Sequence, residues 1–100
     1  AILAESKLLT QAIADMSKAI ELDQENARYR NTRGYFSLSQ DSFDAALEDF
    51  NAAIGLDSSF AQPHNNRGLV RIAKGDPQTA IKDFDEALKI NPQYLDAHNN

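Results

Sequence analysis

The chain has 100 residues, enough for one small domain with its own hydrophobic core. Hydrophobic residues make up 42% and charged residues 25%, which is typical of a globular protein and excludes a collagen-like or disordered chain. The net charge of −5 disfavours a nucleic-acid partner, because an excess of carboxylates repels phosphate groups. The absence of cysteine excludes disulfides and thiolate chemistry. No apolar run approaches the roughly 20 residues that cross a bilayer and no targeting pattern is recognisable, so we expect no membrane insertion.

An internal repeat organises the sequence, because the segments 27–60 and 61–94 are of equal length and align without a gap. The identities fall on small and aromatic positions, namely Gly34 and Gly68, Ala46 and Ala80, Phe50 and Phe84, and Ala53 and Ala87. A shift of one repeat length toward the N-terminus places Ala12, Met16 and Ala19 on the last three of these positions. We therefore predict one domain at 1–100. It has a partial repeat at 1–26 that supplies a second helix, full repeats at 27–60 and 61–94, and the start of a further repeat at 95–100.

The first full repeat is predicted to form two helices. Small and apolar residues recur at helical spacing over 28–39, which predicts the first helix. The second helix is predicted over 43–56, with Ser42 as its cap and a wide apolar stripe that packs on neighbours. The turn between them contains no glycine, so we expect it to be less relaxed than the turn of the next repeat.

The second full repeat is predicted to form helices over 62–74 and 77–90. Its turn contains Gly75, followed by Asp76 as the cap and Pro77 at the first helical position. Asn91-Pro92 ends the second of these helices, because proline cannot continue the hydrogen-bond pattern of a helix.

This unit resembles the tetratricopeptide repeat, a 34-residue helix–turn–helix. The resemblance rests on the small and aromatic positions above and on Pro92, and it covers nearly the whole chain. It implies an all-α fold, an α-solenoid of antiparallel helix–turn–helix repeats in a right-handed superhelix, in which neighbouring pairs share a core. The sequence departs from the family at two kinds of position. Arg30, His64 and His98 stand where a bulky aromatic is expected, and Lys7 and Asp41 stand at the glycine of the turn.

The two histidines, His64 and His98, suggest a metal site or an acid–base pair. They lie one repeat apart with no third type of ligand repeating beside them, so we interpret each as filling the aromatic slot. No serine lies in a Gly-x-Ser-x-Gly elbow, and no glycine-rich phosphate loop occurs. We therefore expect no enzymatic activity, no metal and no cofactor.

Carboxylates and arginines also recur with the period of the repeat. Asp15, Asp49 and Asp83 are each separated by one repeat length, as are Arg33 and Arg67. One interpretation is a row of cation ligands. We favour ion pairs in which an arginine of each first helix binds an aspartate of an adjacent second helix, because a partly buried arginine is seldom left unpaired.

In the family, the first helices line a concave face that holds peptides. The resemblance places Arg28 at one end of this face, Asp96 at the other, and mostly uncharged residues between and beside them: Asn31, Thr32, Tyr35, Leu38, Gln62, Asn65, Asn66, Leu69, Ile72, Asn99 and Asn100. One subtype clamps a C-terminal carboxylate with Lys and Arg. Only Asn66 fits that pattern here, because the other positions hold Asn31, Tyr35, Asp96 and Asn100, so binding of a chaperone tail is disfavoured. The face is more similar to the asparagine ladder of O-linked N-acetylglucosamine transferases, with Asn66 and Asn100 at the ladder position and Thr32 interrupting it.

We therefore predict a non-catalytic scaffold that binds a peptide or a helix of a protein partner on the concave face. The alternatives are a regulatory or substrate-selecting segment of a larger enzyme such as an O-GlcNAc-transferase-like protein, a self-assembling structural segment, and a solvated face without a ligand. Both ends of the sequence cut through a repeat, which predicts incomplete cover of the second-helix faces and hence self-association. The residues concerned are Ile13, Met16, Ile20, Ile81, Phe84 and Leu88.

Overall fold

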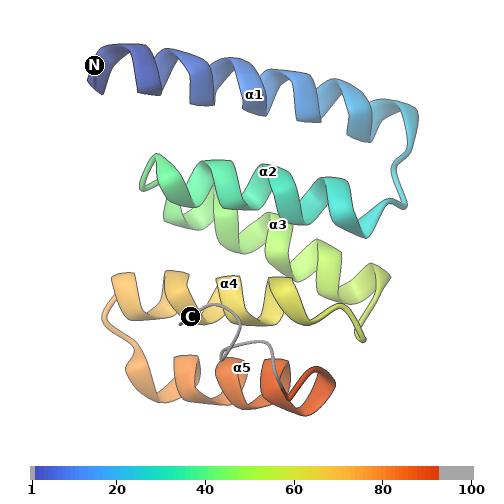
Figure 1. Ribbon diagram of the computed structural model, residues 1–100, viewed down its shortest axis with the longest axis vertical. Coiled ribbons are helices and arrows are strands. Elements are labelled where there is room, and N and C mark those ends of the chain that lie inside the picture. Colours follow the sequence, from blue (N-terminus) through green and yellow to red (C-terminus); the bar gives the residue numbers. More distant parts are fainter. Residues whose placement is uncertain (1, 93–100) are drawn as a thin grey trace.

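The computed structural model describes the backbone of residues 2–92 and the side chains of residues 7–92. The described part is all-helical (Figure 1). In chain order the helices are α1 (Ile2–Leu22), α2 (Ala27–Ser39), α3 (Phe43–Leu56), α4 (Ala61–Ala73) and α5 (Pro77–Ile90). The second helices begin and end where the sequence predicts them, and the first helices differ from their predicted bounds by one residue.

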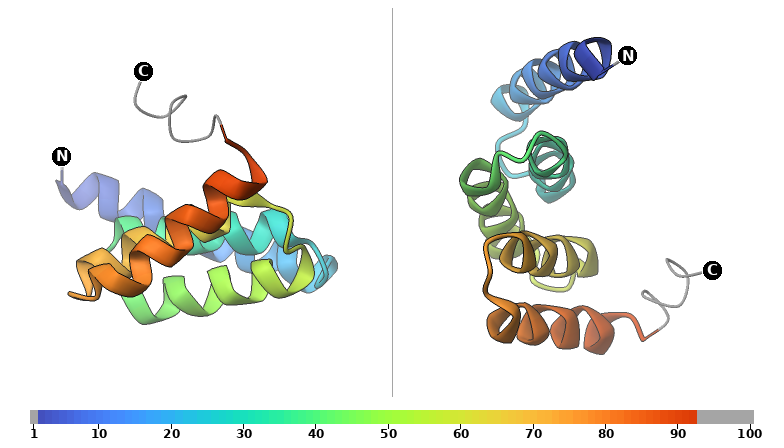
Figure 2. Two further views of the ribbon diagram at one scale, coloured as in Figure 1. Left: turned by 90° about the horizontal axis from the view of Figure 1, so that it is seen from below. Right: turned by 90° about the vertical axis from the view of Figure 1, so that its left-hand side faces the viewer.

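The helices stack into a curved α-solenoid. Helices α2 and α3 form one antiparallel pair, α4 and α5 form the next, and α1 packs on α2 (Figure 1). The end-on view in Figure 2 shows α1, α3 and α5 along the outer arc of the stack and α2 and α4 on its inner side. The predicted first helices therefore line the concave side. None of the described helices is long and apolar enough to cross a membrane.

The two turns inside the repeats differ as their sequences predict. Gly75 adopts a φ of 83°, a left-handed conformation that costs glycine nothing. Asp41, at the corresponding position, adopts a φ of 60°, which is unfavourable for a residue with a Cβ. Asp76 caps α5 by accepting a hydrogen bond from the backbone N–H of Thr79, whereas the side chain of Ser42 makes no such bond at α3.

The core lies where α2, α3 and α4 meet. Ala46, Phe50 and Val70 are completely buried there, which joins the two full repeats into one cooperative unit. Gly34 and Gly68 lie against the rings of Phe50 and Phe84, so the small residues of the repeat allow the paired helices to approach closely.

Helix α1 differs from the repeat pattern. The register of the repeat places a turn near Lys7, but α1 continues through this residue without a break. The segment around Lys7 holds no glycine, proline or aspartate, and its Leu, Lys, Ala and Glu residues favour a helix. The prediction that Ile20 is incompletely buried is wrong. Ile20 is only 5% exposed, because this face of α1 packs in the stack.

Candidate peptide-binding face

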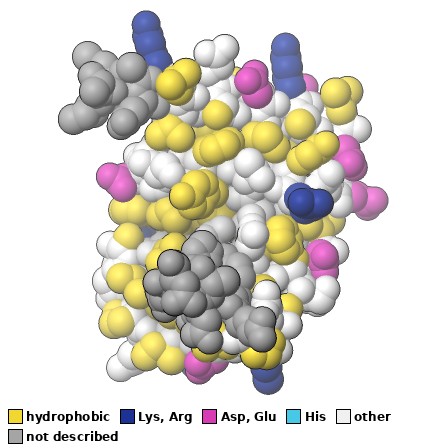
Figure 3. Space-filling view, in the orientation of Figure 1, with side chains coloured by type: hydrophobic (Ala, Val, Ile, Leu, Met, Phe, Trp, Pro, Cys, Tyr) yellow, Lys and Arg dark blue, Asp and Glu magenta, His cyan; other side chains and the backbone are white. Residues whose placement is uncertain are grey.

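The inner side of the stack exposes apolar side chains on both helices that line it. Tyr35 on α2 is 51% exposed, and Leu69 and Ile72 on α4 are 42% and 52% exposed. Figure 3 looks onto this face and shows hydrophobic side chains on the part that the grey atoms leave visible, with most Lys, Arg, Asp and Glu side chains toward the margins. Neighbouring exposed apolar side chains are typical of an interaction surface.

The amides of this face bind one another across the boundary between the repeats. Asn66 of α4 donates from Nδ2 to Oδ1 of Asn31 on α2 over 3.1 Å. Asn31 in turn donates from Nδ2 to Oε1 of Gln62 over 3.0 Å. We call these three residues the amide chain. Asn31 and Asn66 are buried, whereas Gln62 is exposed.

The other predicted residues of the face differ in their surroundings. Thr32 is half-buried and Asn65 is buried. Leu38 is half-buried and packs against the cluster of Ala46, Phe50 and Val70, so part of its side chain serves the core. Asn99 and Asn100 lie outside the described residues, as does Asp96.

In each full repeat one arginine joins the two helices of the repeat to each other and to the preceding helix. Arg33 of α2 donates from Nε and Nη2 to the two carboxylate oxygens of Asp49 on α3, at 2.8 Å and 2.7 Å, and from Nη1 to Ser17 on α1 at 3.1 Å. The hydrogen bond to Asp49 raises the pKa of Arg33 above its usual value and outweighs the opposing effect of burial. Because Asp49 is 5% exposed, this pair compensates a buried charge.

The same joint recurs in the next repeat. Arg67 of α4 binds Asp83 on α5 through Nη2 at 2.7 Å and Asn51 on α3 through Nη1 at 2.9 Å. Asp83 also accepts from Arg71 Nη1 at 2.7 Å. The predicted pairing of Arg33 and Arg67 with aspartates of the second helices is therefore confirmed.

His64 and Arg30 occupy the slot of the expected aromatic. His64 is 5% exposed, and its Nε2 lies 3.2 Å from the carbonyl oxygen of Ser58. Its Nδ1 and the Nε of Arg30 are buried without a hydrogen-bond partner. Among the described side chains no group of three or more potential ligands gathers around a possible metal position, and His98 lies outside the described part.

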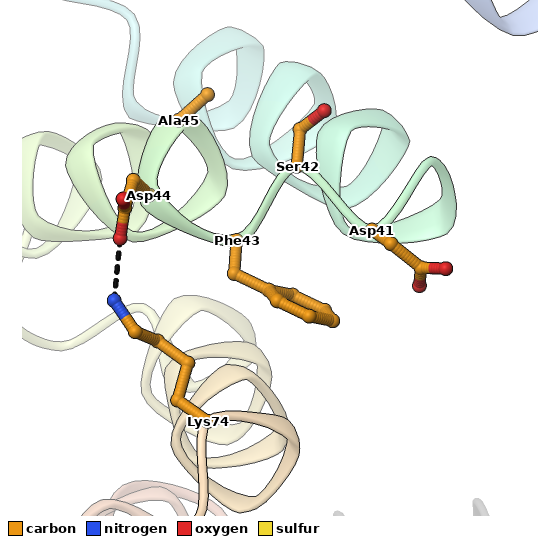
Figure 4. A pocket seen from close by; sticks show the side chains of 6 residues that line it. All are labelled: Asp41, Ser42, Phe43, Asp44, Ala45 and Lys74. Carbon is orange, nitrogen blue, oxygen red and sulfur yellow. Dashed lines mark hydrogen bonds and ion pairs between the residues drawn. The ribbon is translucent and has the colours of Figure 1, made fainter.

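One hollow of about 400 Å³ lies at the turn between α2 and α3, where the sequence analysis predicted no site (Figure 4). It is lined by Asp41, Ser42, Phe43, Asp44, Ala45 and Lys74. Lys74, at the end of α4, reaches across it to form an ion pair with Asp44, and this hydrogen bond lowers the pKa of Asp44 below its usual value. Both side chains are exposed, so the pair is a surface contact between repeats.

A curved stack of antiparallel helix pairs, with a row of helices along its inner side, defines a helical-repeat protein. Two models of the tetratricopeptide repeat match the sequence, one over residues 3–59 and the other over residues 61–94. The chain therefore belongs to the tetratricopeptide repeat family. Among curated proteins, none matches the sequence.

Solved structures with this fold include tetratricopeptide domains that bind peptides. The first TPR of Spaghetti (RPAP3), bound to the HSP90 peptide SRMEEVD, matches with a TM-score of 0.86 and 26% identity over 93% of this chain and 74% of that chain. The OM64 TPR domain of Arabidopsis matches with a TM-score of 0.85 and 29% identity over 87% of this chain and 72% of that chain. MamA matches with a TM-score of 0.79 and 25% identity over 88% of this chain, which spans only 52% of MamA.

Proposed function

We propose that this chain is a non-catalytic interaction module that holds an extended, mostly neutral peptide segment of a protein partner against α2 and α4. The observation that carries the proposal is the exposure of Tyr35, Leu69 and Ile72 on the inner side, beside the amide chain. The apolar side chains supply contact area for one or two side chains of a ligand. The amides supply donors and acceptors that match a peptide backbone without selecting a sequence.

The charges of this face favour a neutral ligand. By position in the family, the described part of the face has one charged residue, the exposed Arg28 near the start of α2. The peptide SRMEEVD, bound by the first TPR of Spaghetti, carries three carboxylate side chains. Asn31 and Tyr35 stand at two positions of the family's carboxylate clamp without fitting its pattern, and neither is basic, so we expect this chain to bind such an acidic tail poorly.

Binding to this chain alone should be weak. Two asparagines at the ladder position, Asn66 and Asn100, and three exposed apolar side chains would give a Kd on the order of 10 µM to 1 mM. Further repeats in a longer protein would strengthen binding by adding contacts to the same ligand.

The test is capture of the protein partner by this chain with Tyr35→Ala and Asn66→Ala combined. Capture should fall at least tenfold, because the double variant removes an exposed apolar contact and an amide of the face. Ile81→Ala is the matched control, since Ile81 is 57% exposed on α5, away from this face. Undiminished capture by the double variant would place the binding surface elsewhere, most plainly on the outer helices.

A further inference from the structure

The middle residue of the amide chain is held at both of its ends. Asn31 accepts from Asn66 over 3.1 Å and donates to Gln62 over 3.0 Å, and both partners lie on α4. Asn31 is 5% exposed, so its amide meets little competition from water. The orientations of the three amides are therefore coupled, because turning one of them alone breaks a hydrogen bond to its neighbour.

The orientation of Asn66 follows from that of Asn31. A side-chain amide has one oxygen acceptor and one nitrogen that donates twice, and the two ends have nearly the same shape. If Asn66 alone turned over, its oxygen would face the oxygen of Asn31, two acceptors would meet in a buried place, and a hydrogen bond would be lost. Asn31 therefore turns the nitrogen of Asn66 toward α2 and leaves Oδ1 as the acceptor of Asn66.

We propose that Asn31 is a positioning residue for ligand binding, which orients Asn66 so that its Oδ1 accepts a hydrogen bond from a backbone N–H of the bound segment. This inference rests on the proposed function of the inner face. It also assigns a role to the first full repeat, in which Thr32 stands at the ladder position. Asn31, the residue before Thr32, instead orients Asn66, which stands at the ladder position of the next repeat.

The inference specifies what the ligand must offer. A peptide bound here presents an N–H at Asn66, so a proline, or an ester bond in place of the amide, at that one position weakens binding. Side chains on either side of that position remain unrestricted by Asn66. The ligand is thus selected by its backbone at this point and by Tyr35, Leu69 and Ile72 beside it.

The experiment uses uncharged 12-residue peptides selected from a random library on the wild-type chain, and retains those whose binding is weakened by Tyr35→Ala. Each retained peptide is then synthesised with single amide-to-ester replacements, which remove one backbone N–H at a time. For the wild-type chain, one replacement should weaken binding about three- to tenfold, the value of one hydrogen bond.

Three variants distinguish positioning from general loosening. Asn31→Leu should lose sensitivity to that ester, because Asn66 is free to turn. Asn31→Asp should retain it, because an ionised carboxylate accepts only and so still orients the nitrogen of Asn66 toward α2. Asn51→Ala is the control and should behave as wild type, because Asn51 also bridges two helices but through Arg67, outside the amide chain.

Hydrogen exchange of the Asn66 side-chain amide provides a readout without ligand. Exchange should be slow in the wild type and in Asn31→Asp and fast in Asn31→Leu. A peptide that depends on Tyr35 but keeps the same ester sensitivity in Asn31→Leu would overturn the inference alone. If no selected peptide depends on Tyr35, the proposed function fails and the inference fails with it.

Discussion

A Cβ atom added to Gly34 would lie 2.7 Å from Cε1 of Phe50, closer than non-bonded carbon atoms approach. Gly68 has the same relationship to Phe84, at 2.6 Å. Each glycine costs its helix about 1 kcal/mol relative to alanine, and close packing of the helix pair on an aromatic ring returns that cost. The same contact recurs in both full repeats and sets the distance between their helices.

Gly34→Ala should therefore destabilise the chain, by about 1–2 kcal/mol, because the overpacking outweighs the gain in helix propensity. Gly55→Ala is the matched control. Gly55 lies within α3, and a Cβ there would meet nothing within 4 Å, so this change should stabilise by about 0.5–1 kcal/mol. Urea denaturation followed by circular dichroism measures both. Equal effects of the two substitutions would show that the ring of Phe50 moves freely.

Phe50→Ala should cost about 3–5 kcal/mol, because the ring is completely buried where α2, α3 and α4 meet. Phe84→Ala should cost less, since Phe84 is half-buried on α5. A loss of this size is a large part of the stability of a small domain, so Phe50→Ala should be largely unfolded at physiological temperature. Thermal denaturation compares the two variants, and a larger loss for Phe84→Ala would contradict the burial order.

Asp83→Ala should destabilise by about 2–4 kcal/mol, because Asp83 is 2% exposed and holds both Arg67 and Arg71. The remaining arginines keep partial contact with water, which limits the loss. Asp44→Ala is the control: its ion pair with Lys74 is exposed, and stability should change little. Chemical denaturation measures the free energy of unfolding of both variants. An unchanged value for Asp83→Ala would mean that Arg67 and Arg71 move into water when their partner is removed.

His64→Phe should stabilise the chain by about 1 kcal/mol, because an aromatic hydrocarbon in the same slot removes the penalty of a buried nitrogen without a hydrogen-bond partner. The variant gives up the contact between Nε2 and the carbonyl oxygen of Ser58, which bounds the gain. The melting temperature of the variant, compared with that of the wild type, measures this gain. A lower melting temperature for the variant would show that the contact to Ser58 outweighs the cost of the unpaired Nδ1.

The isolated chain should associate at high concentration. Ile81 on α5 and Leu8 on α1 are 57% and 67% exposed, and apolar surface of this kind is covered by neighbouring repeats in a solenoid. Analytical ultracentrifugation should show a concentration-dependent increase in mass, and Ile81→Lys should reduce it. A monomer at every concentration would remove self-association as a property of this chain.

The sequence by itself determined the helices of the two full repeats and the Arg–Asp joints. The period of the repeat places Gly34, Phe50 and their equivalents so consistently that the bounds of α2 to α5 follow to within one residue. Arg33 and Asp49 are 16 residues apart, as are Arg67 and Asp83, because each pair lies within one helix–turn–helix whose geometry is local. A contact inside a repeated unit can be predicted once the unit is recognised.

Only the tertiary structure decided what happens between units and where the period breaks. Asn31 meets Asn66 and Gln62, which are 35 and 31 residues away, so neither contact follows from the period. Whether these side chains meet in space depends on how far one repeat rotates relative to the next. Many weak packing contacts together determine that rotation. Leu38 turns partly into the core for the same reason. The continuation of α1 through Lys7 was likewise invisible to the register, because local helix propensity there outweighs the repeat.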